Sequence, residues 1–525
     1  MYLGLRGSSL IAAIGFCCGC GFLLLGYDQG VMGGVVGYSG NTFAQVFDNP
    51  NPTVTGLMVS LYEVGCMFGS ITIIFWGDNL GRRMSLVIGG VIVIIGTVIQ
   101  ASSFSRAQFI VGRIVAGLGN GMNTSTLGTY QSETCPAKNR GRVVTCEGIM
   151  AIGGVWISYW LDFGLSYATS TVQWRLPLAV PAIFALAMSG VAFFMPESPR
   201  WLALKNRDDE AKQVLAALAG EDIRTDDESI LAMHNTIRQA IDYETHIGGE
   251  FSFRELFTGG ELQNFRRICL CFGIQLMEEM GGINLITYYM SNVFLQIGTG
   301  HFLALLLSGV NSTTYFISSF VPIWLIDRFG RKSLLIYGTV GMMCMMIMLT
   351  VSLSFGPANF TAGVFAILSI FLFNIFYATG GWMATPFLYP SEISTLRLRS
   401  KGSAISVLSK WMFNFLVVMI SPVAMANIGW RTYIIFAVLN FVFIFVLFFF
   451  YPETKGLELE QVDKIFTGGD PITRGAIGML PLEFRTINRA KISWINQARL
   501  FPTMSKMWRR VQRSEFEIWN GSRTV

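Results

Sequence analysis

Long runs of apolar residues recur along this chain, and they constrain its fold more than any other feature. A helix needs roughly 20 apolar residues to cross the hydrocarbon core of a bilayer. Lipid offers no partner for backbone polar groups, so only helices and closed barrels span it. Twelve runs of suitable length occur, at residues 10–36, 54–76, 84–104, 107–129, 142–163, 176–195, 268–296, 302–326, 333–355, 362–389, 403–427 and 431–451. The sequence therefore predicts an all-α membrane protein with twelve transmembrane helices.

The composition excludes several other classes of protein. Only 14% of the residues are charged and 52% are hydrophobic, whereas soluble domains carry about 25% charged residues. Nucleic acid binding would gather the basic residues on one soluble face, but here they fall in short clusters between apolar runs. We find no nucleophile–histidine–acid arrangement, metal-ligand spacing or phosphate loop. We expect the lipid bilayer and a small-molecule solute as partners, no nucleic acid, no enzymatic activity, no metal and no cofactor.

The basic residues predict the orientation of the chain. Lys and Arg follow the second, fourth, eighth and tenth runs, whereas the opposite loops at 37–53 and 297–301 contain neither. Loops rich in Lys and Arg remain in the cytoplasm. We therefore expect a multi-pass protein of the plasma membrane with both termini cytoplasmic. Asn359, in the outer-loop sequence Asn-Phe-Thr, is a candidate glycosylation site.

Three charged motifs occur twice, in the same order and at a nearly constant offset. Residues 78–83 match 327–332, Glu133 precedes Arg140 as Glu392 precedes Arg399, and Pro196-Glu197 matches Pro452-Glu453. Such a repeat predicts two six-helix halves with the substrate site at the membrane midplane between them. The predicted organisation is an N-terminal half, a cytoplasmic helical linker, a C-terminal half and a cytoplasmic tail, at residues 1–199, 200–267, 268–455 and 456–525.

The repeated charges are candidates for gating the inner face. Acids and bases at the helix ends would pair when this face is closed and separate when it opens. One partly exposed pair contributes about 0–1 kcal/mol, so several must act together. The alternative is that the charges only set the topology. The candidate gating residues are Asp78, Arg82, Arg83, Glu133, Arg140, Glu197, Asp327, Arg331, Glu392, Arg399 and Glu453.

The first, seventh and tenth runs are long and contain internal Gly or Pro. Examples are Gly33-Gly34, Gly281-Gly282 and Gly380-Gly381. Irregular backbone at membrane depth persists only where protein or an aqueous cavity satisfies it. We expect these three helices to be irregular and to line the cavity.

Several motifs together resemble one known family. They are Gly26-Tyr27-Asp28-Gln29-Gly30, residues 78–83, Gly112-Arg113, residues 196–202 and residues 452–456. Over roughly residues 10–465 the chain resembles the sugar porter family of the major facilitator superfamily. Residues 62–66, 123–126, 159–167 and 173–175 are most similar to fungal sugar or polyol–proton symporters related to the yeast glycerol–proton symporter. The resemblance implies two pseudo-symmetric halves that alternate access to a central site, and we expect a functional monomer.

Asp28 and Arg113 are the candidate proton-coupling residues. An ionisable residue inside a membrane span is costly and suggests function. The resemblance implies that Asp28 takes the coupling proton and that Arg113 is its partner. Protonation would then break the pair and let the halves rock. Two alternatives stay open: a passive facilitator with a permanent ion pair, and a transporter-like nutrient sensor.

The candidate substrate residues gather around the seventh run. Gln275, Glu278 and Glu279 share a helical stripe, and the two glutamates occupy positions where the family usually carries two glutamines. Two buried carboxylates do not both ionise cheaply, so we expect Lys410 to pair with them, unless it extends to an aqueous edge. This charge disfavours a plain hexose and suggests a polyol, a modified or amino sugar, or a polar metabolite. The full set is Gln275, Glu278, Glu279, Asn284, Tyr288, Asn311, Phe387, Lys410 and Trp411.

Overall fold

The computed structural model describes most of the chain up to residue 455. The described ranges are 4–36, 42–135, 140–220, 223–248, 253–259, 263–356, 358–395 and 398–455, together with Val462 and Phe466. Within these ranges every regular element is a helix, which confirms the predicted all-α class. The predicted tail at 456–525 lies outside the described residues, apart from those two positions.

The twelve predicted spans all correspond to helices. The first six are α1 (Gly7–Val35), α3 (Pro52–Leu80), α4 (Arg82–Ala101), α5 (Arg106–Thr134), α6 (Arg140–Leu165) and the pair α7 (Val172–Ala179) and α8 (Pro181–Phe194). The short helix α2 (Thr42–Val46) follows α1. The last six are α12 (Asn264–Glu278) with η2 (Glu279–Ile283) and α13 (Asn284–Gln296), α14 (His301–Ser318) with α15 (Pro322–Phe329), α16 (Arg331–Ser354), α17 (Phe360–Thr379) with α18 (Thr385–Ile393), α19 (Arg399–Ile428) and, after η3 (Gly429–Arg431), α20 (Thr432–Phe450).

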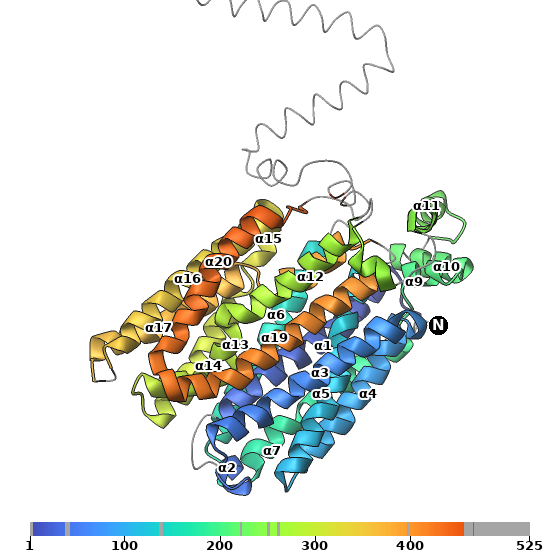
Figure 1. Cartoon of the computed structure of the whole chain (residues 1–525). Helices are drawn as coiled ribbons and strands as arrows, with labels where there is room; N and C mark the ends of the chain where they lie inside the picture. The colour runs from blue at the N-terminus through green and yellow to red at the C-terminus, as the bar shows by residue number, and fades with distance from the viewer. Residues whose placement is uncertain are drawn as a thin grey trace, which may run out of the picture. The chain divides into compact units, whose positions relative to one another are not determined.

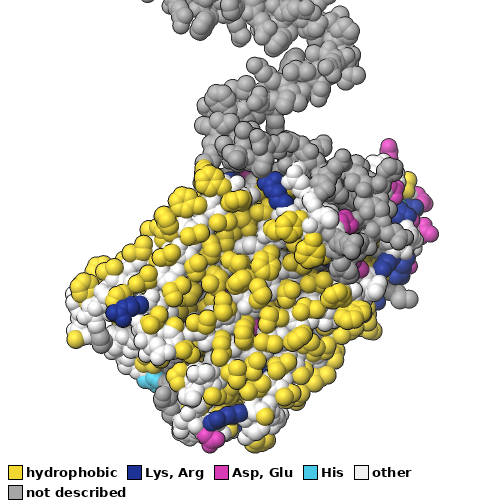
Figure 2. Space-filling view, in the orientation of Figure 1, with side chains coloured by type: hydrophobic (Ala, Val, Ile, Leu, Met, Phe, Trp, Pro, Cys, Tyr) yellow, Lys and Arg dark blue, Asp and Glu magenta, His cyan; other side chains and the backbone are white. Residues whose placement is uncertain are grey.

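Apolar side chains cover the outside of this bundle. Among the described residues, nine segments are long and apolar enough to cross a membrane, and the segment Lys401–Phe450 contains both α19 and α20. The spans formed by α5 and by α12 with α13 are more polar because they bury polar side chains inside the bundle, such as Arg113 and Glu278. Figure 2 shows apolar side chains over the visible face and charged ones mainly towards its ends. This surface suits contact with lipid.

The first run is a regular helix, so the expected break in it is wrong. Helix α1 continues without interruption from Gly7 to Val35. Its glycines instead lie against α6: a side chain at Gly26 would collide with Ala151, and one at Gly34 would collide with Asp162. The glycines therefore permit close helix packing rather than irregular backbone.

The seventh and tenth runs are broken as expected. Gly282 has φ of 103° inside η2, which interrupts the α-helical pattern between α12 and α13. Gly381 has φ of 70° in the turn between α17 and α18. A positive φ of this kind favours glycine because it has no Cβ. Both breaks adjoin helices that carry candidate substrate residues.

Replacing Gly282 with alanine should destabilise the protein by about 1–3 kcal/mol, the usual strain of a non-glycine residue in this conformation. The added Cβ would also meet Met346 at 2.7 Å and Phe436 at 3.2 Å. Thermal unfolding in detergent should show a lower midpoint. The matched control is Gly190→Ala in α8, where a Cβ has no atom within 4 Å. Equal midpoints for both variants would contradict the assigned role of Gly282.

The segment predicted as a helical linker contains α9 (Pro199–Leu204), α10 (Asp208–Ala219), α11 (Glu228–Gly248) and η1 (Phe253–Phe257). Trp201 and Leu202 of α9 pack against Ala211 and Val214 of α10. Figure 1 shows α9, α10 and α11 at the end of the bundle where the amino terminus lies. The linker and the amino terminus therefore share one side of the protein.

Candidate functional site

A small polar cavity lies between the two halves of the bundle. The N-terminal half contributes residues of α1 and α6, and the C-terminal half contributes residues around η2 and from α14, α17 and α19. Its volume open to a water-sized sphere is only about 10 Å³, roughly the space of one water molecule, so the cavity is closed. The lining residues are Gln29, Ile152, Val155, Glu278, Ile283, Asn284, Thr287, Tyr315, Tyr377, Met383 and Lys410.

Three charged side chains meet at this cavity. Lys410 Nζ lies 3.2 Å from Glu278 Oε1 and also forms an ion pair with Glu279. The predicted contact between Lys410 and the glutamates is thus confirmed. Only 1% of the Lys410 side chain is exposed, so the alternative in which it reaches an aqueous edge is wrong. We call Glu278, Glu279 and Lys410 the charged triad.

Neutral groups hold the charged triad in place. The Tyr377 hydroxyl donates to Glu278 Oε1 over 2.9 Å, and the Asn284 amide donates to Glu279 Oε2. Hydrogen bonds to a charged acceptor are stronger than those between neutral groups. The orientation of both carboxylates is therefore fixed from three helices.

Five other predicted substrate residues do not line this cavity: Gln275, Tyr288, Asn311, Phe387 and Trp411. Gln275 is buried one turn before the charged triad, and the Tyr288 hydroxyl accepts a 3.3 Å hydrogen bond from Asn414. Asn311 donates to the Met290 sulfur over 3.3 Å. Phe387 packs edge-on against Phe22 with ring centroids 5.3 Å apart, and the Trp411 indole donates to Thr124 over 3.3 Å. The two aromatic residues thus contact the opposite half.

The expected ion pair between Asp28 and Arg113 is absent among the described residues, so this prediction is wrong. Asp28 Oδ2 accepts a 2.5 Å hydrogen bond from the Tyr62 hydroxyl. The Arg113 guanidinium lies over the Tyr62 ring, 4.4 Å from its centroid, and donates to the Val59 carbonyl. Tyr62 therefore contacts both residues. A cation over an aromatic face is attracted by the ring, so Tyr62 connects the two charges.

Sequence reasoning predicted Tyr288 but missed three other tyrosines of this site. Tyr62 links Asp28 to Arg113, while Tyr315 and Tyr377 line the cavity beside the charged triad. A phenol inside a membrane span buries its hydroxyl only with a hydrogen-bond partner. That rule marks such tyrosines as candidates, but it does not select these three from the others in the chain.

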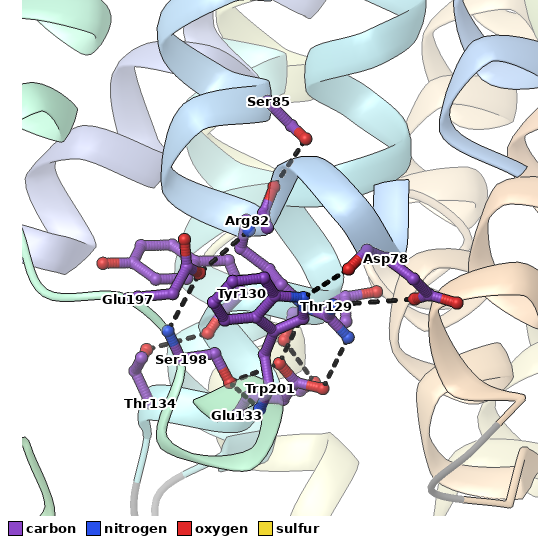
Figure 3. Close-up of polar contacts among 12 residues, drawn as sticks. Asp78, Arg82, Ser85, Thr129, Tyr130, Glu133, Thr134, Glu197, Ser198 and Trp201 are labelled. Carbon is purple, nitrogen blue, oxygen red and sulfur yellow. Dashed lines mark hydrogen bonds and ion pairs between the residues drawn. The ribbon is translucent and has the colours of Figure 1, made fainter. Parts of the chain in front are cut away.

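The repeated charges of the N-terminal half form a compact cluster (Figure 3). Arg82 Nε lies 3.1 Å from Glu133 Oε2, which also accepts from the Ser198 hydroxyl over 2.6 Å. Glu197 accepts from the backbone N–H groups of Arg82 and Arg83. Burial raises the pKa of Glu197, although these N–H groups and the Arg82 charge oppose the rise. The cluster connects α4, α5 and the residues just before α9.

The C-terminal half repeats this cluster. Arg331 Nη2 lies 3.1 Å from Glu392 Oε1, and Glu392 Oε2 accepts from the Thr454 hydroxyl. Glu453 accepts from the backbone N–H of Arg331 over 2.9 Å. Each of these ion pairs therefore lies within one half of the protein. The expectation that these charges separate when the inner face opens stays a prediction.

Asp78 and Lys401 form an ion pair that joins the two halves, beside Trp201 of α9. Asp78 was a predicted gating residue, whereas Lys401 was assigned only to topology. Asp78 belongs to α3 and Lys401 to α19, and these helices pack side by side. Arg399, also predicted, is buried near Lys401. The side chains of Arg140 and Asp327 lie outside the described structure.

Replacing Lys401 with methionine should favour separation of the two halves at this pair. The expected shift is at most about fivefold, or 1 kcal/mol, because Asp78 is 38% exposed. The measurement is the alkylation rate of a cysteine placed at Ser403, which lines a narrow space between α5 and α19. Lys401→Arg is the control that keeps the charge. Equal alkylation rates in the two variants would contradict the role of this pair.

Asn359 remains a candidate for glycosylation. It lies at the start of α17, is exposed, and its side chain accepts a hydrogen bond from the Ala362 N–H over 3.2 Å. The turn between α16 and α17 lies at the opposite end of the bundle from the linker helices (Figure 1). This position is compatible with the predicted outer loop.

Comparisons with known proteins all match this chain to transporters. A sequence model described as "Sugar (and other) transporter" matches residues 14–466. The protein named MFS-type transporter oryC of Aspergillus oryzae is 36% identical, over 89% of this chain and 87% of its own length. Sugar transporter STL1 of Saccharomyces cerevisiae is 35% identical, over 88% of this chain and 82% of its own length.

A solved structure shares the fold. It is a proton:xylose symporter, XylE, bound to 6-bromo-6-deoxy-D-glucose, and it superimposes with a TM-score of 0.76. Sequence identity is 25%, and the match covers 88% of this chain and all of the other.

Proposed function

The chain belongs to the sugar transporter family of the major facilitator superfamily, and from this membership we propose that it carries a sugar or polyol across the plasma membrane together with a proton. The family consists of membrane transporters rather than enzymes. The observation that carries the proposal is the polar cavity between the two halves, because alternating access requires a central site that either side can close.

Contacts on two sides of the cavity support alternating access. Asp78 and Lys401 join the halves at the end near the linker. Towards the other end of α6, the Trp156 and Trp160 indoles donate to the Thr313 hydroxyl of α14 over 3.0 and 2.8 Å. A small cavity with contacts on both sides suits a closed state between the two open ones.

The surroundings of Asp28 support proton coupling. The side chain is 2% exposed, and its Oδ1 atom has no hydrogen-bond partner in the described part of the chain. Its partner Tyr62 contacts Trp411 of the other half, with ring centroids 6.2 Å apart. A proton on Asp28 would alter the Tyr62 hydrogen bond and hence the contact between the halves. Protons are thus the proposed coupling ion.

The side chains that line the cavity suit a small solute that is rich in hydroxyl groups. Gln29, Asn284 and Thr287 offer donors and acceptors, and Tyr315 and Tyr377 add phenol groups. We propose that the protein functions as a monomer. We also propose that both termini lie in the cytoplasm with the linker, because the linker helices and the amino terminus share one end of the bundle (Figure 1).

Uptake into a yeast strain that lacks its own sugar and polyol carriers tests this proposal. Radiolabelled glycerol, xylitol, xylose and glucose should be compared, with and without a protonophore. We expect at least one solute to accumulate above its external concentration and the protonophore to remove that accumulation. Uptake that only equilibrates would indicate a passive facilitator instead. Binding without uptake would indicate a sensor.

A further inference from the structure

The charged triad carries more negative than positive charge. When all three groups are ionised, two carboxylates face one ammonium. All three side chains are almost completely buried, with at most 2% of any residue exposed. Burying an uncompensated charge is strongly unfavourable. A bound proton or another positively charged group must therefore balance the charge of the triad.

One oxygen of the triad is available for that charge. Glu279 uses both oxygens, on Lys410 and Asn284. Glu278 uses only Oε1, which accepts from both Tyr377 and Lys410. In the described part of the chain, Glu278 Oε2 has no hydrogen-bond partner, although Glu278 lines the cavity. A proton on this atom would neutralise the excess charge without disturbing the contacts of Oε1.

The other titratable groups nearby do not supply a positive charge. Besides Lys410 on α19, the groups that face the two glutamates are Tyr315 on α14, Tyr377 on α17 and Glu63 on α3. Glu63 is fully buried and adds negative charge when ionised. Arg113 interacts with Glu63 and lies over Tyr62, on the side of Asp28. Among the residues that the structure describes, the excess charge of the triad therefore has no protein partner of its own.

We propose that Glu278 is a second proton-binding site, which takes up one proton when the cavity is loaded and releases it on the other side of the membrane. This inference rests on the proposed symport, in which Asp28 binds the first proton. The proton adds to Oε2 of Glu278 and gives a neutral carboxylic acid, while Lys410 stays paired with Glu279. The acid can then donate a hydrogen bond to a solute hydroxyl in the cavity. Proton and solute thus bind together.

The two proton sites are connected through α19. Lys410 of the triad is followed by Trp411, whose ring contacts Tyr62, the hydrogen-bond partner of Asp28. If protonation of one site moves α19, the contacts of the other site change as well. Protonation of either site can therefore alter the other.

Infrared spectroscopy of the reconstituted protein tests proton binding without any solute. A protonated carboxylic acid has a carbonyl stretching band separate from that of a carboxylate. We expect Glu278→Gln to remove one such band that Asp28→Asn leaves in place. A spectrum of Glu278→Gln with the same protonated bands as wild type at every pH would overturn the proposal.

Accumulation in proteoliposomes tests whether this proton is transported. With the membrane potential held at zero, each coupled proton supports about a tenfold solute ratio per unit of pH gradient. The solutes to compare are glycerol, xylitol, xylose and glucose. For the one that wild type accumulates, we expect an inside-to-outside concentration ratio of about one hundred per unit of pH gradient. Glu278→Gln should reduce it to about ten. The double variant Glu278→Gln/Lys410→Met leaves Glu279 alone and should restore the wild-type ratio, because the triad again needs one proton.

The possible results separate the two proposals. A wild-type ratio of about ten that Glu278→Gln leaves unchanged keeps the symport but overturns the second site. A wild-type ratio of one for every solute overturns the symport itself. A missing infrared band in wild type, combined with tighter binding of glucosamine than of glucose, would mean that an amine on the solute balances the charge, and this also overturns the second proton site.

Discussion

Asp28→Asn is expected to reduce the solute accumulation ratio about tenfold per unit of pH gradient, the share of one coupled proton. Asparagine has nearly the same shape as aspartate but cannot exchange a proton. It still accepts the hydrogen bond from Tyr62 that the structure shows, so the fold should be kept. Flux down a concentration gradient should continue. Radiolabelled solute in proteoliposomes, with the membrane potential held at zero, measures both quantities.

The matched control for Asp28→Asn is Glu147→Gln. Glu147 is also a buried carboxylate of the N-terminal half, with 3% exposure, but it lies on α6 away from Tyr62 and Arg113. Its removal should leave the accumulation ratio unchanged. If Glu147→Gln lowers the ratio and Asp28→Asn does not, the assignment of the coupling residue is wrong.

Lys410→Met is expected to destabilise the protein by about 3–5 kcal/mol, the usual effect of removing one partner from a buried ion pair. The substitution leaves Glu278 and Glu279 together without their ammonium. Both lose a charged contact, since Lys410 touches each of them. Thermal unfolding in detergent should show a clearly lower midpoint, and transport should be lost in the same variant.

Neutralising the glutamates should reverse this effect. The triple variant Lys410→Met/Glu278→Gln/Glu279→Gln places a neutral amide pair where sugar porters usually carry two glutamines. Its unfolding midpoint should return close to that of wild type, because no buried charge remains without a partner. A midpoint as low as that of Lys410→Met alone would show that the lysine acts by packing rather than by charge.

Much of the architecture could be predicted from the chain alone because lipid imposes it. A span must be helical and about 20 residues long, so the apolar runs of the sequence predicted all twelve membrane spans. The repeated motifs predicted that Arg82 and Arg331 have equivalent surroundings, and the two clusters around them show this equivalence. The contact of Lys410 with Glu278 was also predictable, since two buried carboxylates require a positive partner.

Other features depended on how the helices pack. The glycines of α1 looked like a break, but they fit against α6 and leave the helix regular. Whether glycine bends a helix or brings it close to a neighbour depends on that neighbour, which local sequence does not contain.

Sequence by itself determined the helical class, the two-fold repeat and the identity of the charges that need partners, because these follow from the cost of burying polar groups in lipid. Only the tertiary structure decided which groups meet. It brought Tyr62 into contact with both Asp28 and Arg113, and it paired Asp78 with Lys401 across the halves. Contacts between helices far apart in the chain depend on their rotation and depth, and a single side chain can change both.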